Sequence, residues 1–220
     1  MLNTVQIIAF THRQFNFDEI GFFHLDDKQR IDILTNLKTN LDIDELMYLS
    51  TCNRVEFILS HKKKITKTFV EKLIKQLLTD QLPANLKDIV DRAEIINSKA
   101  AVHHIFSVAS SIDSLVVGER EIITQVRKAF EECRENNLCG DVIRVLVQAT
   151  ISTAKKVYTE SNIGTRPVSI VSLAFLEMKK YISKKPKKIL VIGACYIIFF
   201  SNISPFFILR FGKLQSINKF

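Results

Sequence analysis

The sequence predicts an α+β fold over residues 1–160, with helices packed on an antiparallel sheet. Four short segments rich in β-branched and aromatic residues are typical of strands, and two segments with apolar residues three and four positions apart are typical of amphipathic helices. They occur in the order strand, helix, strand, strand, helix, strand. This order is that of the split βαβ, or ferredoxin-like, arrangement, here with added helices.

Each element of this arrangement has its own signal. The strands are expected at residues 4–12, 44–52, 54–60 and 93–97. The two helices between them, at residues 26–41 and 66–78, each have an apolar face, which in the second is formed by Phe69, Leu73, Ile74 and Leu77.

The second half of the chain is expected to be mainly helical, with helices at residues 99–110, 119–136 and 141–160. Ser98 is expected to cap the first of them. Residues 162–165 break the pattern, and Pro167 suits the first turn of a helix that runs to residue 181. The apolar run at residues 189–194 predicts a buried strand of the parallel type. We therefore expect a first domain over residues 1–160, a helical connector with an incomplete Rossmann-type segment over 161–194, and an aberrant tail over 195–220.

The net charge of +8 is concentrated near the end of the chain. From residue 179 onward there are nine Lys or Arg and no Asp or Glu, which leaves 22 basic and 23 acidic side chains in residues 1–178. Binding of nucleic acid would therefore use a local patch, such as the lysine-rich stretch at 61–67. The four cysteines show no paired metal spacing, and no targeting segment precedes the first strand. We expect a cytoplasmic protein with free thiols and no metal site.

One cysteine, Cys52, lies between the second and third expected strands. A turn between strands can present a side chain to solvent, and the polar neighbours Thr51, Asn53 and Arg54 argue against a buried structural thiol. A guanidinium two residues away favours the thiolate, which is the nucleophilic form. Cys52 is therefore the candidate nucleophile, whereas Cys133 and Cys139 are interpreted as inert packing or surface thiols.

Three blocks of this sequence resemble, in the same order, those of the glutamyl-tRNA reductase family. The first is Ser50-Thr51-Cys52-Asn53-Arg54, followed by Glu56. The second runs from His104 to Gly118-Glu119 and on to Gln125, and the third is Gly164-Thr165 with Ser169 and Ser172. The resemblance covers residues 3 to 194, and three blocks in order make it specific.

The resemblance implies an oxidoreductase of tetrapyrrole (porphyrin) biosynthesis. The implied reaction is the NADPH-dependent reduction of glutamyl-tRNA to glutamate-1-semialdehyde through a thioester on Cys52. The implied partners are glutamyl-tRNA and the downstream semialdehyde aminomutase, and no membrane is expected. The family forms homodimers through a C-terminal domain that has no counterpart in this sequence.

The resemblance also assigns roles to the remaining site residues. His104 would assist proton transfer or hold substrate, although a lone helical histidine is more often structural. Thr51 and Asn53 would orient the turn, and Arg54 suits a bidentate grip on the substrate carboxylate. The residues that match positions lining the family's glutamate pocket are Ser114, Glu119 and Gln125; Glu119 could instead be an acid that stabilises a helix start.

The resemblance to a dinucleotide-binding fingerprint stops at Gly193, the cofactor-binding residue that remains. Cys195 and Ile198 stand where G-x-G-x-x-G requires its second and third glycines. Residues 195–220 have three explanations: a frameshift or truncation, a membrane anchor formed by the charge-free residues 189–209, or a divergent sheet segment. We therefore expect at most a glutamyl-tRNA esterase that Cys52→Ser abolishes. The alternative is a non-enzymatic tRNA-binding or regulatory module, tethered to a membrane by its C-terminal segment.

Overall fold

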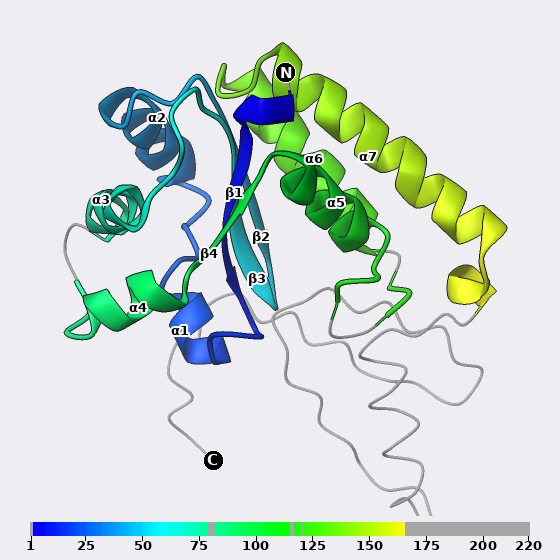
Figure 1. Ribbon diagram of the computed structural model, residues 1–220, viewed down its shortest axis with the longest axis horizontal. Helices are drawn as coiled ribbons and strands as arrows, with labels where there is room; N and C mark the ends of the chain where they lie inside the picture. Colours follow the sequence, from blue (N-terminus) through cyan, green and yellow to red (C-terminus); the bar gives the residue numbers. More distant parts are fainter. Residues whose placement is uncertain (1, 79–81, 115–116, 120, 166–220) are drawn as a thin grey trace, which may run out of the picture. The chain divides into compact units, whose positions relative to one another are not determined.

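A four-stranded antiparallel sheet is the centre of the fold (Figure 1). The computed structural model describes residues 2–78, 82–114, 117–119 and 121–165. The strands are β1 (Val5–Thr11), β2 (Glu45–Thr51), β3 (Arg54–Ser60) and β4 (Glu94–Asn97), in the spatial order β2-β3-β1-β4. Every neighbouring pair is antiparallel, so β1 and β2 run in the same direction with β3 between them.

Helices cover both faces of this sheet. All seven residues of β1 and all seven of β3 are buried, which requires cover on both sides. Figure 1 shows α2 and α3 on one face and α5, α6 and α7 on the other. The helices are α1 (Phe17–Gly21), α2 (Arg30–Asn40), α3 (Lys67–Leu77), α4 (Leu86–Arg92), α5 (Ser98–Ala109), α6 (Glu121–Glu135) and α7 (Asp141–Glu160), with short 3-10 turns at Leu2–Thr4 and Asn162–Thr165.

The four predicted strands are confirmed to within one or two residues, and α7 has the predicted bounds. The predicted first helix begins too early, because Asp26 forms a turn in which its side chain accepts from the backbone N–H of Lys28. The prediction that Ser98 caps α5 is wrong: Ser98 is the first helical residue and Asn97 occupies the cap position. The short helices α1 and α4 were not predicted, since five and seven residues are too few to show a helical period. Of the predicted connector, only residues 161–165 are described, and Asn162–Thr165 form the 3-10 turn at the predicted break; the helix expected up to residue 181, the 189–194 strand and the tail lie outside the described residues.

The long helix α7 is capped at its start by a side chain from the sheet. The Glu45 carboxylate, at the first residue of β2, accepts from the backbone N–H groups of Val142 at 3.0 Å and Ile143 at 2.8 Å. Gly140, at the cap position, has no side chain of its own to do this. A Cβ atom at Gly140 would lie 2.6 Å from Glu45 Oε1, so the glycine makes room for the distant carboxylate. A negative charge there also complements the positive end of the helix dipole.

Gly140→Ala is therefore expected to lower the free energy of unfolding by about 1–2 kcal/mol, the cost of losing a helix cap. The methyl group displaces the Glu45 carboxylate from both backbone donors. Denaturant unfolding measures the effect. Gly21→Ala is the matched control, because nothing lies within 4 Å of a Cβ there, and it should not destabilise. An equal cost of Gly140→Ala in a Glu45→Ala background would contradict the explanation.

Candidate active site

The turn between β2 and β3 presents Cys52 to solvent. Thr51 and Arg54 are paired across the two strands, which leaves Cys52 and Asn53 as a two-residue turn. Asn53 is buried, and its backbone holds the turn: its N–H donates to Thr51 Oγ1 at 3.3 Å, and its carbonyl accepts from the His12 N–H at 3.0 Å. Cys52 is exposed, whereas Cys133 is buried and Cys139 half-buried. Of these three thiols, Cys52 is therefore the one best placed to meet a large substrate.

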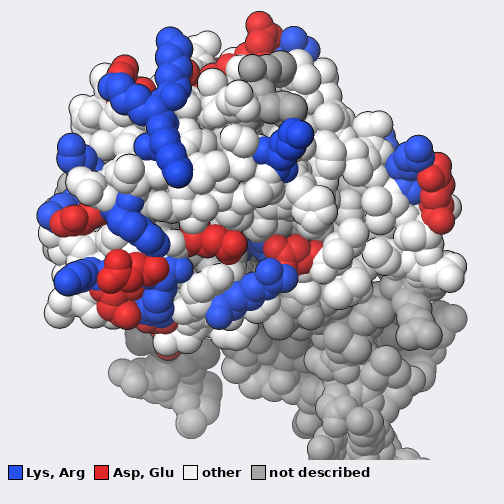
Figure 2. Space-filling model, viewed as in Figure 1, with Lys and Arg blue, Asp and Glu red and all other residues white. Residues whose placement is uncertain are grey.

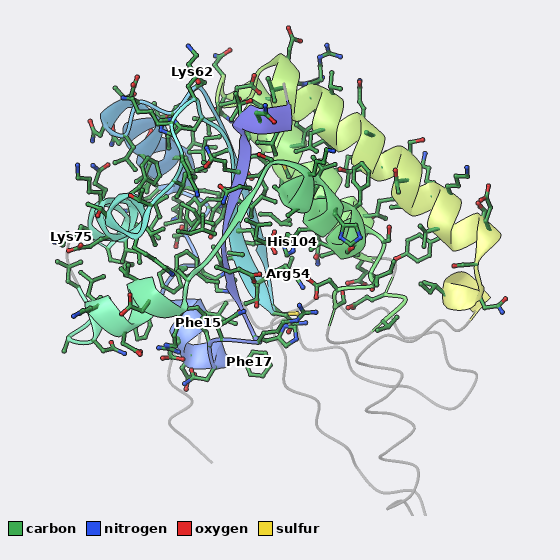
Figure 3. The ribbon with its side chains drawn as sticks, viewed as in Figure 1. Phe15, Phe17, Arg54, Lys62, Lys75 and His104 are labelled. Carbon is green, nitrogen blue, oxygen red and sulfur yellow. The ribbon has the colours of Figure 1, made fainter. Side chains whose placement is uncertain are left out.

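Behind this turn lies a network of buried charges. Arg54 is 2% exposed and its Nη1 donates to Glu56 Oε1 at 2.7 Å. His104 Nε2 lies 2.9 Å from the same Glu56 oxygen. Asp113 completes the network: its carbonyl oxygen accepts from Arg54 Nη2, and its carboxylate lies 3.6 Å from His104 Nδ1 and is also paired with Arg13. Figure 3 labels Arg54 beside the end of the sheet, with His104 close to it.

The network brings together two residues that the sequence assigned to the site, Arg54 and His104. Both of them meet on Glu56, which the sequence analysis did not assign to the site. Its signal was available: an acidic residue in the middle of the apolar strand Val55–Leu59 must find buried partners. Asp113 and Arg13 were also missed, because nothing local predicts contacts between residues a hundred positions apart.

The charges in the network shift the pKa values of its members. Burial alone would lower the pKa of His104, but the hydrogen bond and negative charge of Glu56 outweigh it, so this pKa is raised. Burial alone would raise the pKa of Glu56, but His104 and Arg54 together lower it. Glu56 therefore stays ionised and His104 is favoured as a cation. The three positive charges of Arg13, Arg54 and protonated His104 then exceed the two negative charges of Glu56 and Asp113, which favours an anion beside the turn.

The raised pKa of His104 predicts a pH-dependent stability. A histidine whose pKa is raised on folding stabilises the protein fully below its unfolded-state pKa, and this contribution is lost as the pH rises through the folded-state pKa. The stability lost in His104→Gln, measured by denaturant unfolding, should therefore shrink as the pH rises from below the ordinary histidine pKa of about 6.5 through the raised folded-state pKa. His103→Gln on the exposed side of α5 is the control and should cost little. A His104→Gln cost that grows with pH would contradict the assignment.

The loop between α5 and α6 places Asp113 and the end of the second sequence block. The buried Ser111 hydroxyl accepts from the backbone N–H groups of Gly118 at 3.1 Å and Glu119 at 2.9 Å, closing the loop on itself. Gly118 has φ 92°, a conformation that suits glycine. The carbonyl of Glu119 accepts from Tyr158 of α7 at 2.9 Å. Ser111 and Gly118 of this block thus have a structural role in shaping the loop, and Glu119 takes part in it through its backbone.

The remaining predicted site residues lie on or near this loop. Ser114 follows Asp113 directly and is half-buried. The side chain of Glu119 is half-buried, and burial together with the nearby charge of Glu121 raises its pKa. Gln125 is half-buried one turn into α6. It stays a prediction that these three side chains contact a glutamyl group and that Arg54 binds the carboxylate of that group. In this structure both terminal nitrogens of Arg54 already donate to protein acceptors.

The lysine-rich stretch that the sequence offered as a tRNA patch contains one lysine bound to the protein and two in long, exposed ion pairs. Lys67 Nζ donates to the carbonyls of Val90, Asp91 and Ala93 at 2.7–2.9 Å, so it caps the end of α4. Lys62 and Lys63 lie 3.7 Å from Asp44 and Asp42. On the face shown in Figure 2, basic and acidic side chains are interspersed. Lys62 and Lys63 themselves remain strongly exposed, at 83% and 79% of their side chains.

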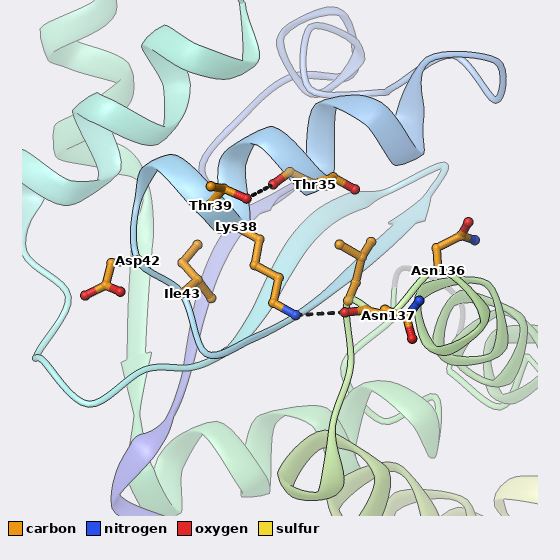
Figure 4. A pocket seen from close by; sticks show the side chains of 8 residues that line it. Thr35, Lys38, Thr39, Asp42, Ile43, Asn136 and Asn137 are labelled. Carbon is orange, nitrogen blue, oxygen red and sulfur yellow. Dashed lines mark hydrogen bonds between the residues drawn. The ribbon is translucent and has the colours of Figure 1, made fainter.

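A surface pocket of about 540 Å³ lies at the other end of β2 (Figure 4). It is bordered by α2 and by the loop after α6, and Lys38 Nζ crosses it to the Asn137 carbonyl at 2.8 Å. β2 has seven residues between this pocket and the Cys52 turn, a length of about 20 Å. Because of this distance, the pocket is not part of the candidate site.

The comparisons with known proteins decide the family. A family model described as the N-terminal domain of glutamyl-tRNA(Glu) reductase matches residues 8–161. The chain belongs to the glutamyl-tRNA reductase family. It is similar to a glutamyl-tRNA reductase of Campylobacter jejuni subsp. jejuni, with 35% identity over 190 residues, 85% of this chain and 42% of that protein. A glutamyl-tRNA reductase of Nitratiruptor sp. is 37% identical over 171 residues, 76% of this chain and 38% of that protein.

The fold agrees with this family. A solved structure of the glutamyl-tRNA reductase from Methanopyrus kandleri superposes with a TM-score of 0.62, at 22% identity, over 81% of this chain and 40% of that one. The present chain thus spans about two fifths of the length of these reductases. Gly193, assigned to the cofactor, lies outside the described residues. Within the described residues, no helix is both long and apolar enough to span a membrane.

Proposed function

We propose that this chain forms the acyl-transfer site of a glutamyl-tRNA reductase, in which Cys52 takes the glutamyl group from glutamyl-tRNA. The observation that carries the proposal is an exposed cysteine on a tight turn, backed by a network of charged side chains in which Arg13, Arg54 and His104 surround Glu56 and Asp113. The substrate, glutamyl-tRNA, is inferred from the resemblance of the surrounding sequence blocks to those of the family. The strand order β2-β3-β1-β4 supports the finer assignment of this domain as ferredoxin-like.

The reaction transfers the glutamyl group from its oxygen ester on tRNA to a thioester on Cys52. Cys52 Sγ, as the thiolate, attacks the carbonyl carbon of the glutamyl ester, and a C–S bond forms. The bond from that carbon to the terminal ribose oxygen breaks, and the oxygen takes a proton from water. Because an aminoacyl ester is already activated, the site needs no strong base if the thiolate is available. The products are free tRNA and a glutamyl thioester on Cys52.

The network would act on this step through charge and position. Arg54 and protonated His104, held by Glu56, supply positive potential behind the turn where the oxyanion develops. Arg13 is the most exposed cation of the network, with 59% of its side chain accessible, and lies where an anionic substrate group would approach. The proton-transfer role of His104 remains a hypothesis, since both of its ring nitrogens face carboxylates.

The reducing half of the family reaction is not assigned to the described residues. When bound, NADPH supplies the hydride that reduces a thioester to an aldehyde. The described sheet is antiparallel and so lacks the parallel strand, glycine turn and helix that hold a dinucleotide. The residues that the structure describes therefore do not fit this cofactor. The family suggests four further proposals. The whole reductase would form glutamate-1-semialdehyde, be located in the cytoplasm, form a homodimer, and act together with an aminomutase.

A covalent-capture experiment tests the proposed function. The chain is mixed with tRNA charged with radiolabelled glutamate and quenched in acid. We expect label bound to protein and released by neutral hydroxylamine, as a thioester is. Label that stays on tRNA while the tRNA is retained by the protein would contradict the proposal and favour the non-enzymatic tRNA-binding module.

A further inference from the structure

The segment between β1 and α2 reaches both sides of Cys52. At its start, the His12 N–H donates to the carbonyl of Asn53, the residue after Cys52. Near its end, His24 Nδ1 is hydrogen-bonded to the hydroxyl of Ser50, two residues before Cys52. Helix α1 lies between these two attachments. The segment 12–24, here called the wall, is therefore attached at its two ends on either side of the candidate nucleophile.

This wall is held in place by buried aromatic rings. Phe23 stacks on Phe10 of β1 with a centroid distance of 3.9 Å, and Phe15 lies against both rings. Arg92 of α4 covers Phe15 at 4.4 Å and binds the Glu19 carboxylate of α1. A helix of five residues thus has a fixed position, which an isolated short helix would not have.

Two further phenylalanines on the same wall are turned outward. Phe17 is 60% exposed and Phe22 is 52% exposed, although neither is needed for the buried cluster. Figure 3 shows Phe17 below the end of the sheet where Arg54 lies. Exposed aromatic rings held rigidly beside a reactive group are a feature of binding surfaces.

The proposed acyl transfer fixes what must lie beside this wall. The ester that Cys52 attacks joins glutamate to the terminal ribose of the tRNA. The terminal adenine is attached to that same ribose, so it must lie next to the Cys52 turn during the reaction. Nucleobases of single-stranded ends are commonly bound by stacking on aromatic side chains.

We propose that Phe17 and Phe22 form a stacking site for the 3′-terminal nucleobases of the acyl-donor tRNA. This inference rests on the proposed function and adds to it a binding surface outside the charge network.

Two substrates separate binding of the base from the chemistry. Acylation of Cys52 is followed by intact mass with glutamyl-tRNA and, separately, with a small glutamyl thioester that has no nucleoside. For Phe17→Ala and Phe22→Ala, we expect acylation by subsaturating glutamyl-tRNA to fall about 5- to 100-fold at one or both positions, the range for loss of one base stack. Acylation by the small thioester should be unchanged. Phe17→Trp should retain the rate with tRNA.

A matched control and a direct readout complete the test. Val145→Ala removes an apolar side chain that is 40% exposed near the start of α7, at the other end of the sheet, and should leave both substrates unaffected. A tRNA with 2-aminopurine at its 3′ end should be quenched on binding to the wild type and not to the double variant Phe17→Ala/Phe22→Ala. Equal losses with both substrates, or unchanged quenching, would overturn the stacking site. Failure of the wild type to be acylated by either substrate would instead overturn the proposed function.

Discussion

Replacing Arg54 with methionine is expected to lower the free energy of unfolding by about 3–5 kcal/mol, the usual cost of removing one partner from a buried ion pair. Arg54 is 2% exposed, and the side chain of its partner Glu56 is fully buried. In the variant, His104 would be the remaining partner of Glu56 Oε1. The other carboxylate oxygen, Oε2, has no hydrogen-bond partner among the described residues even in the wild type. The variant therefore leaves a buried carboxylate half compensated.

Two variants separate this effect from the loss of a surface charge. Lys75→Met breaks the exposed pair with Glu71 on α3 and should cost at most about 0.5 kcal/mol. Replacing Glu56 with leucine in the Arg54→Met background removes the stranded charge and should recover part of the loss. Denaturant titration measures all three. A loss below about 1 kcal/mol for Arg54→Met would show that the network does not support the fold.

Cys52→Ala is expected to reduce glutamyl transfer to the protein by at least about 10³-fold, because no other described group at the turn can form the thioester. The exposed side chain contributes little to packing, so the variant should unfold at the same denaturant concentration as the wild type. Single-turnover acylation with glutamyl-tRNA measures the effect. Binding of the tRNA itself should be largely retained.

The half-buried Cys139 provides the matched control. Its thiol donates to the Leu46 carbonyl at 3.3 Å at the opposite end of β2, and the neighbouring Cys133 thiol together with burial raises the pKa of Cys139. Cys139→Ala should therefore leave acylation unchanged. Acylation that survives Cys52→Ala and is lost in Cys139→Ala would place the nucleophile elsewhere.

Much of the fold could be predicted because local pattern and tertiary structure agree in the strands. The apolar runs around Ile7 and Ile58 are long enough to identify β1 and β3. Both strands are buried along their whole length, which explains why apolar and polar residues do not alternate along them. The cap of α7 could not be predicted, since its carboxylate comes from Glu45, far away in sequence. The same holds for Lys67, which reads as a solvated charge and instead caps α4.

The site was predictable in part for the same reason. Cys52 stood out because a two-residue turn between strands is a local feature. Its supporting network was not visible, because Arg54 and His104 meet through Glu56 and Asp113, and these contacts exist only once the sheet and α5 are packed. The sequence suggested that Arg54 grips substrate, whereas the structure adds a structural role for it within the network.

Peptide mapping of the acylated protein tests the central proposal most directly. The chain is mixed with glutamyl-tRNA, quenched in acid, digested and analysed by mass spectrometry. The proposal predicts one glutamyl group on the peptide that contains Cys52, bound through sulfur and removed by neutral hydroxylamine. An unmodified Cys52 peptide with glutamate still esterified to tRNA, or a glutamyl group on another cysteine, would contradict it.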